Sequence, residues 1–536
     1  MTRLIFATAA IACAATLATP ASAQRTRISP YIEASQVIAA DLNGGDVLTY
    51  STVAVGVDAT VQTRRVEVQA SYKYERRFDY QDRLAQDDMH SGLIRAKAAV
   101  APGFSIEGGA IATRTRSDIR GDALLTAQGN NRNSSQVYSA YVGPNLATNI
   151  GPMFANAAYR FGYTKVEAAG ATGVNPGAPR LDAYDDSKVH VATASVGVKS
   201  GTVLPIGITA SGSYTREDAG QLDQRYEGKF GRLDVVVPLV RGFAVAGGVG
   251  YEKIQISQRD PLRDGTGNPV VDNNGRFITA PGSPRRLAYD IDGMFWDAGV
   301  IWKPSRRTFL EARVGRRYES MSYTGSFTRQ LSAGSGIQLG VYDTVQTFGQ
   351  QLGGNLSSLP TSFVTTNDGF GNEYGGCIYG TVGSATGGCL NSVFASSATS
   401  AYRSRGVTGV AVLNRGGTRL GFGGGYARRT FIAPNNATGF NVNGTSDESI
   451  YAQMFASTDV GADGSLSGSV FGSFFNTDIP GSDSVTGWGA NTAYTHRFGK
   501  LGATVSAGVF GFDNKNATTN SSNAAAQALL GLRYGF

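Results

Sequence analysis

Hydrophobic and polar residues alternate with a period of two along most of the chain. In the run 51–61 every second residue is aliphatic, and the residues between are mostly small or polar. After the short link Gln62–Arg65 the pattern resumes, with Val66, Val68, Ala70, Tyr72 and Tyr74 on one side and Glu67, Gln69, Ser71, Lys73 and Glu75 on the other. Successive side chains of a strand point to opposite faces, so these runs predict a β-hairpin with one apolar face. A two-layer sandwich would also bury one such face.

The recurrence of these runs and their connections favour a barrel over a sandwich. Tight links alternate with long ones. The tight links lie near 101–103, 149–152, 201–205, 240–242, 304–307, 415–417, 462–464 and 498–500, and the long ones span 79–89, 118–134, 167–188, 257–292, 350–402 and 432–446. Short periplasmic turns and long extracellular loops are the habit of outer-membrane barrels. The sequence therefore predicts an all-β, transmembrane, antiparallel up-and-down barrel of about 22 strands, within a range of about 18–24.

Both ends of the chain carry export signals. Arg3, the apolar run Leu4–Leu17 and the small residues Ala21 and Ala23 predict a signal peptide, residues 1–23, cleaved after Ala23. The last residues alternate again, with Leu532, Tyr534 and Phe536 on the apolar side. This ending resembles the C-terminal signal of Gram-negative outer-membrane barrels, which the barrel-assembly machinery reads. We expect the cell outer membrane as location, with membrane lipids and lipopolysaccharide as contacts.

One barrel domain, residues 24–536, is the simplest organisation. No composition shift divides the chain, and its mean hydropathy of −0.15 leaves no apolar stretch of the length, about 18 residues, that a spanning helix needs. The content of 71 Gly, 24 Tyr and 26 Phe fits a barrel, although a secreted β-solenoid could share it. The first strand is expected at about 28–39. That leaves no room for the N-terminal plug of 22-stranded TonB-dependent transporters, so we expect a different class.

Cys377 and Cys389 stand twelve residues apart in the Gly-, Ser- and Thr-rich segment 350–402. In an oxidising compartment such an isolated pair predicts one disulfide. The segment is either an infolded constriction loop or a disulfide-clipped surface loop.

Charged residues fall on the face opposite the apolar one and predict a ladder along the lumen: Lys73, Arg95, Lys97, Arg160, Glu311, Arg313, Arg317 and Glu319. A barrel of this width is too wide for its own side chains to fill, so we expect an aqueous interior unless loops plug it. Two interpretations are open. The ladder guides a hydrophilic, anionic solute, in keeping with the net charge of +7, which becomes +6 without Arg3. Alternatively, cross-strand ion pairs stiffen the wall and select nothing.

The sequence gives little support for a catalytic site or a metal site. His90, His190 and His496 are the only histidines, and none has the Ser or Asp partner that barrel hydrolases use. The runs 264–268 and 272–275 resemble calcium-loop fragments but lack the closing Glu, so they predict hairpin turns. We expect no enzyme, no cofactor, no metal and no nucleic-acid partner.

The run 302–318, with its Pro turn and the strand Gly315-Arg316-Arg317-Tyr318, continues into a Tyr-containing hairpin that ends at Gln330. This stretch resembles the large barrels that accompany PEP-CTERM/exosortase-type exopolysaccharide systems. The resemblance implies a place in exopolysaccharide export, with export components as partners. Similar chains are sometimes labelled preprotein translocase subunit YajC, a small protein with one spanning helix that nothing here matches. We expect a porin-like channel for hydrophilic solutes or an export accessory. The alternative is a non-conducting surface or assembly barrel whose loops bind polysaccharide, lipopolysaccharide or a partner.

Overall fold

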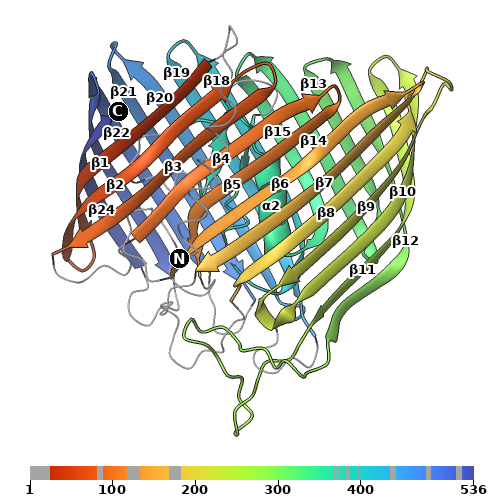
Figure 1. Cartoon of the computed structure of the whole chain (residues 1–536), viewed down its shortest axis with the longest axis horizontal. Coiled ribbons are helices and arrows are strands. Elements are labelled where there is room, and N and C mark those ends of the chain that lie inside the picture. The colour runs from red at the N-terminus through yellow and green to blue at the C-terminus, as the bar shows by residue number, and fades with distance from the viewer. Residues whose placement is uncertain are drawn as a thin grey trace.

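The chain forms one closed ring of tilted strands (Figure 1). This computed structural model describes residues 25–80, 88–117, 133–167, 183–365, 370, 374–381, 386–395, 397–434, 442–478, 484–514 and 522–536. Within these ranges, no helix has both the length and the apolar character required to cross a membrane.

Twenty-two strands make up the wall. They are β1 (Arg25–Asp41), β2 (Val47–Gln62), β3 (Val66–Asp79), β4 (Asp88–Ala101), β5 (Phe104–Arg116), β6 (Ser134–Ile150), β7 (Met153–Glu167), β8 (Asp186–Val198), β9 (Gly207–Ala219), β10 (Arg225–Val240), β11 (Phe243–Gln258), β12 (Arg286–Ser305), β13 (Thr308–Arg317), β14 (Ser320–Ser332), β15 (Ser335–Gln346), β18 (Ala401–Arg415), β19 (Thr418–Ile432), β20 (Ser446–Val460), β21 (Gly464–Thr477), β22 (Val485–Phe498), β23 (Leu501–Asn514) and β24 (Ser522–Gly535). Four short elements lie outside the wall: the 3-10 turn η1 (Gln221–Asp223), the helix α2 (Phe348–Ser358) and the strands β16 (Cys377–Tyr379) and β17 (Gly387–Cys389).

Each wall strand pairs antiparallel with its neighbour in the chain, and β15 pairs with β18 across the intervening segment. The seam between β24 and β1 closes the ring, with Tyr31 opposite Gly535 and Ile38 opposite Ala528. Closure leaves no strand edge with bare backbone groups, which a lipid-exposed sheet could not tolerate. The predicted fold class and the count of 22 strands are confirmed. Figure 1 shows short turns along one rim and the longer connections along the other.

The alternation of the sequence separates a lipid face from a lumen face. In β2, Val53 and Val55 are about half exposed, at 49% and 51%. Ala54, which lies between them, is buried, and so is Tyr50 on the same face as Ala54. The same division holds at the C-terminus, where Leu532, Tyr534 and Phe536 are 40–65% exposed. Exposure of such large aliphatic and aromatic side chains to water would cost free energy, whereas contact with the hydrocarbon of a membrane is favourable. The apolar face therefore points outward.

The best-packed part of the molecule lies inside the ring. The described residues of the stretch 347–400, between β15 and β18, fold inward, and Figure 1 shows α2 within the barrel behind the front strands. Their apolar side chains form buried clusters with three different stretches of the inner wall. We call residues 347–400 the infolded segment. The disulfide between Cys377 and Cys389 lies within this segment.

Candidate functional site

Helix α2 fixes the start of the infolded segment against the wall. Thr347 caps it by accepting a hydrogen bond from the Gln350 amide at 3.2 Å. Phe348, Leu352 and Leu356 then recur at helical spacing, and all three are fully buried. They pack in one cluster with inward residues of β4, β5 and β6, namely Leu93, Ile111, Val137 and Tyr141. The helix is thus held by its apolar stripe to one side of the lumen.

A disulfide-closed hairpin fixes the middle of the segment on the opposite side. Cys377 and Cys389 face each other in the β16–β17 pair and form a disulfide. The disulfide lies directly over Gly423 of β19, where a Cβ atom would collide with Cys377 Sγ and come within 2.8 Å of Cys389 Sγ. Tyr379 lies in the same way over Gly421. Glycine at these inward positions lets the hairpin approach the wall backbone, which any side chain would prevent.

Polar side chains of the wall bind the backbone of the segment. The Gln69 amide donates to the carbonyl of Phe363 at 2.7 Å and accepts from its N–H at 2.9 Å. Gln453 Oε1 accepts from the Cys377 N–H at 2.9 Å, and Arg95 donates to the Ser357 carbonyl at 3.0 Å. These bonds satisfy backbone groups that packing would otherwise leave without water.

The segment spans the depth of the lumen. It leaves the wall at the extracellular end of β15 and returns at β18. In between, the Thr381 carbonyl comes close to Gly334, in the periplasmic turn between β14 and β15, where a Cβ would meet it at 2.7 Å. The segment therefore reaches both rims and narrows the interior along its whole length.

Charged side chains on the inner face of β10–β13 form a paired network, which includes Glu311 and Arg313 of the predicted ladder. Arg232 of β10 contacts Asp234 at 2.7 Å and Asp297 of β12 at 2.5 Å. Arg313 of β13 contacts the same two carboxylates at 2.8 and 2.9 Å, and Glu311 at 2.5 Å. Each arginine thus faces at least two carboxylates, and the five side chains carry no net positive charge. This geometry favours the wall-stiffening interpretation over an anion path.

The network crosses β11 because β11 has a glycine there. A Cβ on Gly248 would come within 2.7 Å of Asp234 Oδ1 and would collide with the Arg232 guanidinium. The missing side chain lets charges of β10 reach β12 and β13. Sequence alternation placed the charges on the inner face but could not show which strand would be bridged.

The stretch that carries the resemblance to exopolysaccharide-associated barrels also builds this wall. Arg317 contacts Glu252 of β11 at 2.8 Å, and its guanidinium lies over the rings of Phe295 and Tyr318. Tyr318 and Glu319 both have positive φ, of 52° and 60°, and form the two-residue turn between β13 and β14. The placement of Glu319 on the strand ladder is therefore wrong: the strand ends at Arg317, and Glu319 lies in an exposed turn.

The remaining ladder residues lie on β3, β4 and β7, with their side chains inward. Lys73 contacts Glu75 at 3.5 Å, and Arg160 contacts Glu107 at 3.8 Å. Arg95 is buried over the Tyr141 ring. Lys97 is exposed and stands in register between Glu67 of β3 and Glu107 of β5. This side of the lumen is also balanced between the two signs of charge.

The three histidines lie apart on the outer face, each beside a tyrosine. His90 Nδ1 is 2.6 Å from the Tyr72 hydroxyl, His190 Nδ1 is 2.8 Å from that of Tyr159, and His496 Nδ1 is 3.2 Å from that of Tyr494. The three histidines do not share a site.

The acidic runs of the β11–β12 loop form turns. Asp264 accepts hydrogen bonds from the Thr266 and Asn268 amides, each at 2.9 Å, and the hydrogen bond from the Thr266 hydroxyl lowers the pKa of Asp264. Across the ranges given above, no three His, Cys, Asp or Glu side chains gather as a metal site would need. Ala21 and Ala23 of the predicted cleavage site lie outside the described residues. Recognition of Leu532, Tyr534 and Phe536 during assembly stays a prediction.

Comparison with known proteins gives neither a matching family model nor a matching curated protein. Solved structures do overlap with the chain. They include the ferric-catecholate import receptor Fiu of Escherichia coli K12 (11% identity, TM-score 0.41, 94% of this chain and 81% of that one), the FrpB iron transporter of Neisseria meningitidis (9%, 0.42, 95% and 82%) and the siderophore receptor PirA of Acinetobacter baumannii (9%, 0.42, 96% and 81%).

The closed ring, its apolar outer face and its polar inner wall define the class of this protein. It is an outer-membrane β-barrel, and its location is the cell outer membrane.

Proposed function

We propose that this barrel is a porin-like channel for hydrophilic solutes, and that the infolded segment sets the width of its passage. The observation that carries the proposal is the position of that segment: it is fixed to the inner wall by α2 and by the disulfide hairpin, and it extends between the two rims. A loop held inside a wide barrel restricts passage without closing the ring.

The wall that the α2 and hairpin contacts leave uncovered is hydrophilic. Inward positions of β8, β9 and β14 carry hydroxyl groups that are wholly or partly exposed: Thr193, Ser211, Ser213, Thr324 and Ser326. Together with the paired charges of β10–β13, they give a water-compatible surface along one side of the interior. This surface supports passage of small polar solutes without a strong preference for charge sign.

A link to exopolysaccharide export is part of the proposal and rests on the resemblance at 302–330. In the structure these residues form the end of β12 and the β13–β14 hairpin, where they stabilise the wall. A role with export components would therefore be exerted by other surfaces of the barrel.

A second candidate is a surface or assembly barrel, which one observation favours. The β11–β12 loop has a fixed shape: Arg276 is buried, donates to the Tyr184 carbonyl at 3.2 Å and contacts Asp185 at 3.3 Å. An ordered loop of this kind presents a constant surface to a polysaccharide or protein. Removal of residues 265–284 would then abolish surface attachment and leave conductance unchanged.

Single-channel conductance in planar bilayers tests the channel. The wild-type barrel should conduct, and replacement of residues 348–399 by a short Gly/Ser linker should raise the conductance severalfold because the lumen widens. The 265–284 deletion is the matched control, since that loop lies outside the wall. Silence of both the wild type and the segment deletion, in barrels that remain folded, would contradict the channel and favour the second candidate.

A further inference from the structure

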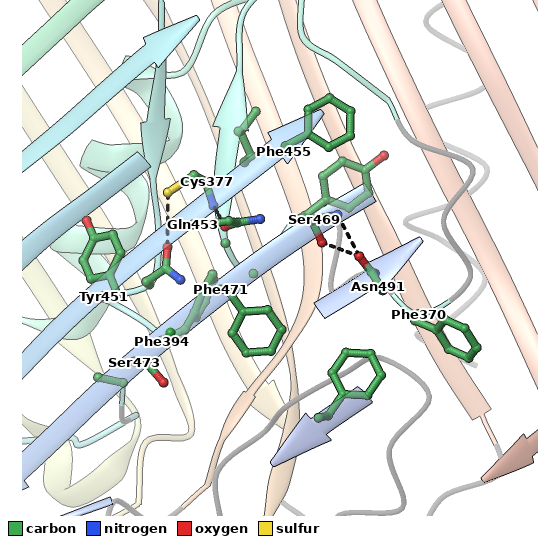
Figure 2. A pocket seen from close by; sticks show the side chains of 18 of the residues that line it. Phe370, Cys377, Phe394, Tyr451, Gln453, Phe455, Ser469, Phe471, Ser473 and Asn491 are labelled. Carbon is green, nitrogen blue, oxygen red and sulfur yellow. Dashed lines mark hydrogen bonds between the residues drawn. The ribbon is translucent and has the colours of Figure 1, made fainter. Parts of the chain in front are cut away.

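A cavity of about 210 Å³ lies between the infolded segment and the inner faces of β20–β23. Figure 2 shows its two sides: Phe370, Cys377 and Phe394 come from the segment, and Tyr451, Gln453, Ser469, Phe471 and Asn491 come from the wall. Such a cavity is smaller than the roughly 300–1,000 Å³ of pockets for drug-sized ligands, so it suits about one small ring.

Aromatic rings form the floor of this cavity. Phe471 and Phe510 stack with centroids 6.3 Å apart at 28°, and Phe370 meets Phe510 edge to face. The first two rings meet over Gly489, where a Cβ would lie 2.7 Å from Phe471 and 2.6 Å from Phe510. Glycine thus allows both rings to lie close against the wall. Phe471 remains partly exposed toward the lumen, so it offers an apolar contact surface there.

All but one of the polar side chains among the described lining residues are uncharged. Gln453, Ser449 and Ser467 line the cavity, and their amide and hydroxyl groups offer both donors and acceptors. Ser469 and Asn491 are joined by hydrogen bonds of 2.5 and 3.0 Å and add further donors and acceptors. Among the described lining residues the only charged side chain is Arg114. Donors and acceptors of both kinds suit hydroxyl groups, which can donate and accept, better than they suit an ion.

We propose that this cavity binds one ring of an uncharged saccharide. A pyranose ring has apolar C–H faces, which pack on aromatic rings, and hydroxyl groups around its edge, which need neutral donors and acceptors in the plane of the ring. The cavity supplies Phe471, which packs on the buried Phe510, for a face and Gln453, Ser449 and Ser467 for the edge. The inference deepens the proposed channel function, on which it rests, by naming the class of solute.

Isothermal titration calorimetry of the detergent-solubilised full chain tests this assignment. Maltohexaose is the neutral probe, hexagalacturonate the anionic probe and sorbitol the acyclic polyol. We expect maltohexaose to bind and the other two to bind at least about tenfold more weakly. Phe471→Leu, which keeps apolar volume but removes the ring, should weaken maltohexaose binding about tenfold. Ser467→Ala should weaken it about threefold, as loss of one neutral hydrogen bond does. Ser326→Ala, on the inner face of β14 and outside the cavity lining, should leave it unchanged.

The inference is overturned if wild-type protein binds no maltohexaose, if hexagalacturonate or sorbitol binds equally well, or if both Phe471→Leu and Ser467→Ala bind like the wild type. Calorimetry needs no conduction, so it separates the two proposals. A barrel that binds maltohexaose but never conducts contradicts the channel only, and one that conducts but does not bind contradicts the saccharide site only.

Discussion

Two regions of the inner wall share the same alternation of inward and outward residues but differ in the chemistry of the side chains that point inward. The inner face of β10–β13, the charged arc, holds Arg232, Asp234, Asp297, Glu311 and Arg313 in a half-hydrated network. The inner face of β20–β23, the neutral arc, holds serine, glutamine, asparagine and aromatic side chains beneath the infolded segment. The paired charges of the charged arc are partly exposed, whereas the rings of the neutral arc lie where the infolded segment covers the wall. The interior of a wide barrel is therefore patterned by what lies opposite each strand.

One buried ion pair tests how burial affects the stability that paired charges contribute. Arg429 and Asp447, on β19 and β20 beside the neutral arc, meet at 2.6 Å with side chains only 2% exposed. Asp447→Ala should lower the free energy of unfolding by about 3–5 kcal/mol, because it leaves a buried guanidinium without its carboxylate. Guanidinium unfolding in lipid vesicles, followed by tryptophan fluorescence, measures the change. A loss below about 1 kcal/mol would show that water reaches Arg429.

The matching change in the charged arc should cost less. Asp297 is 15% exposed, and its partners keep Asp234 and Glu311 when it is removed. Asp297→Ala should therefore cost about 2 kcal/mol by the same measurement. It should also shift the reversal potential toward anion selectivity, because two arginines against three carboxylates become two against two and the cluster loses its excess negative charge. An equal or larger loss than for Asp447→Ala would abolish the distinction between the two regions.

Adding one methyl group to β19 tests the contact between the infolded segment and the wall. Gly423→Ala places a Cβ against the disulfide, and the hairpin must move away from β19. We expect a loss of about 1–2 kcal/mol and a higher, noisier conductance. Gly472→Ala is the control, because a Cβ there meets nothing within 4 Å. Identical conductance traces for both variants would mean that the hairpin does not restrict the passage.

Local sequence was sufficient for the wall. Period-two runs such as 51–61, and the alternation of tight and long links, specify strand number and side-chain direction because both depend only on neighbours in the chain. The placement of Glu319 failed for a local reason as well, since nothing in the run 309–320 marks the positive φ of the turn.

The interior depended on contacts that sequence patterns do not reveal. Gln69 binds Phe363 across 294 positions, and the disulfide lies on Gly423, one of many glycines in its strand. A glycine in a strand can mark a bulge, a bend or a close approach, and its partner decides which. The neutral cavity was missed for the same reason. Its signal was the spacing of Ser467, Ser469, Phe471 and Ser473 on one inward face without any charge.

The path of residues 347–400 imposes an order on biogenesis. Both ends of this stretch leave the wall at the outer rim, while its midpoint reaches the inner rim. If β1 and β24 had already paired, the midpoint of the segment would have to be inserted through the closed barrel. The stretch must instead be tucked in, and its cysteines joined by the oxidants of the periplasm, before the terminal strands meet. The pairing of β1 with β24 is therefore the last step of folding, and it closes the ring around an infolded segment that is already in place.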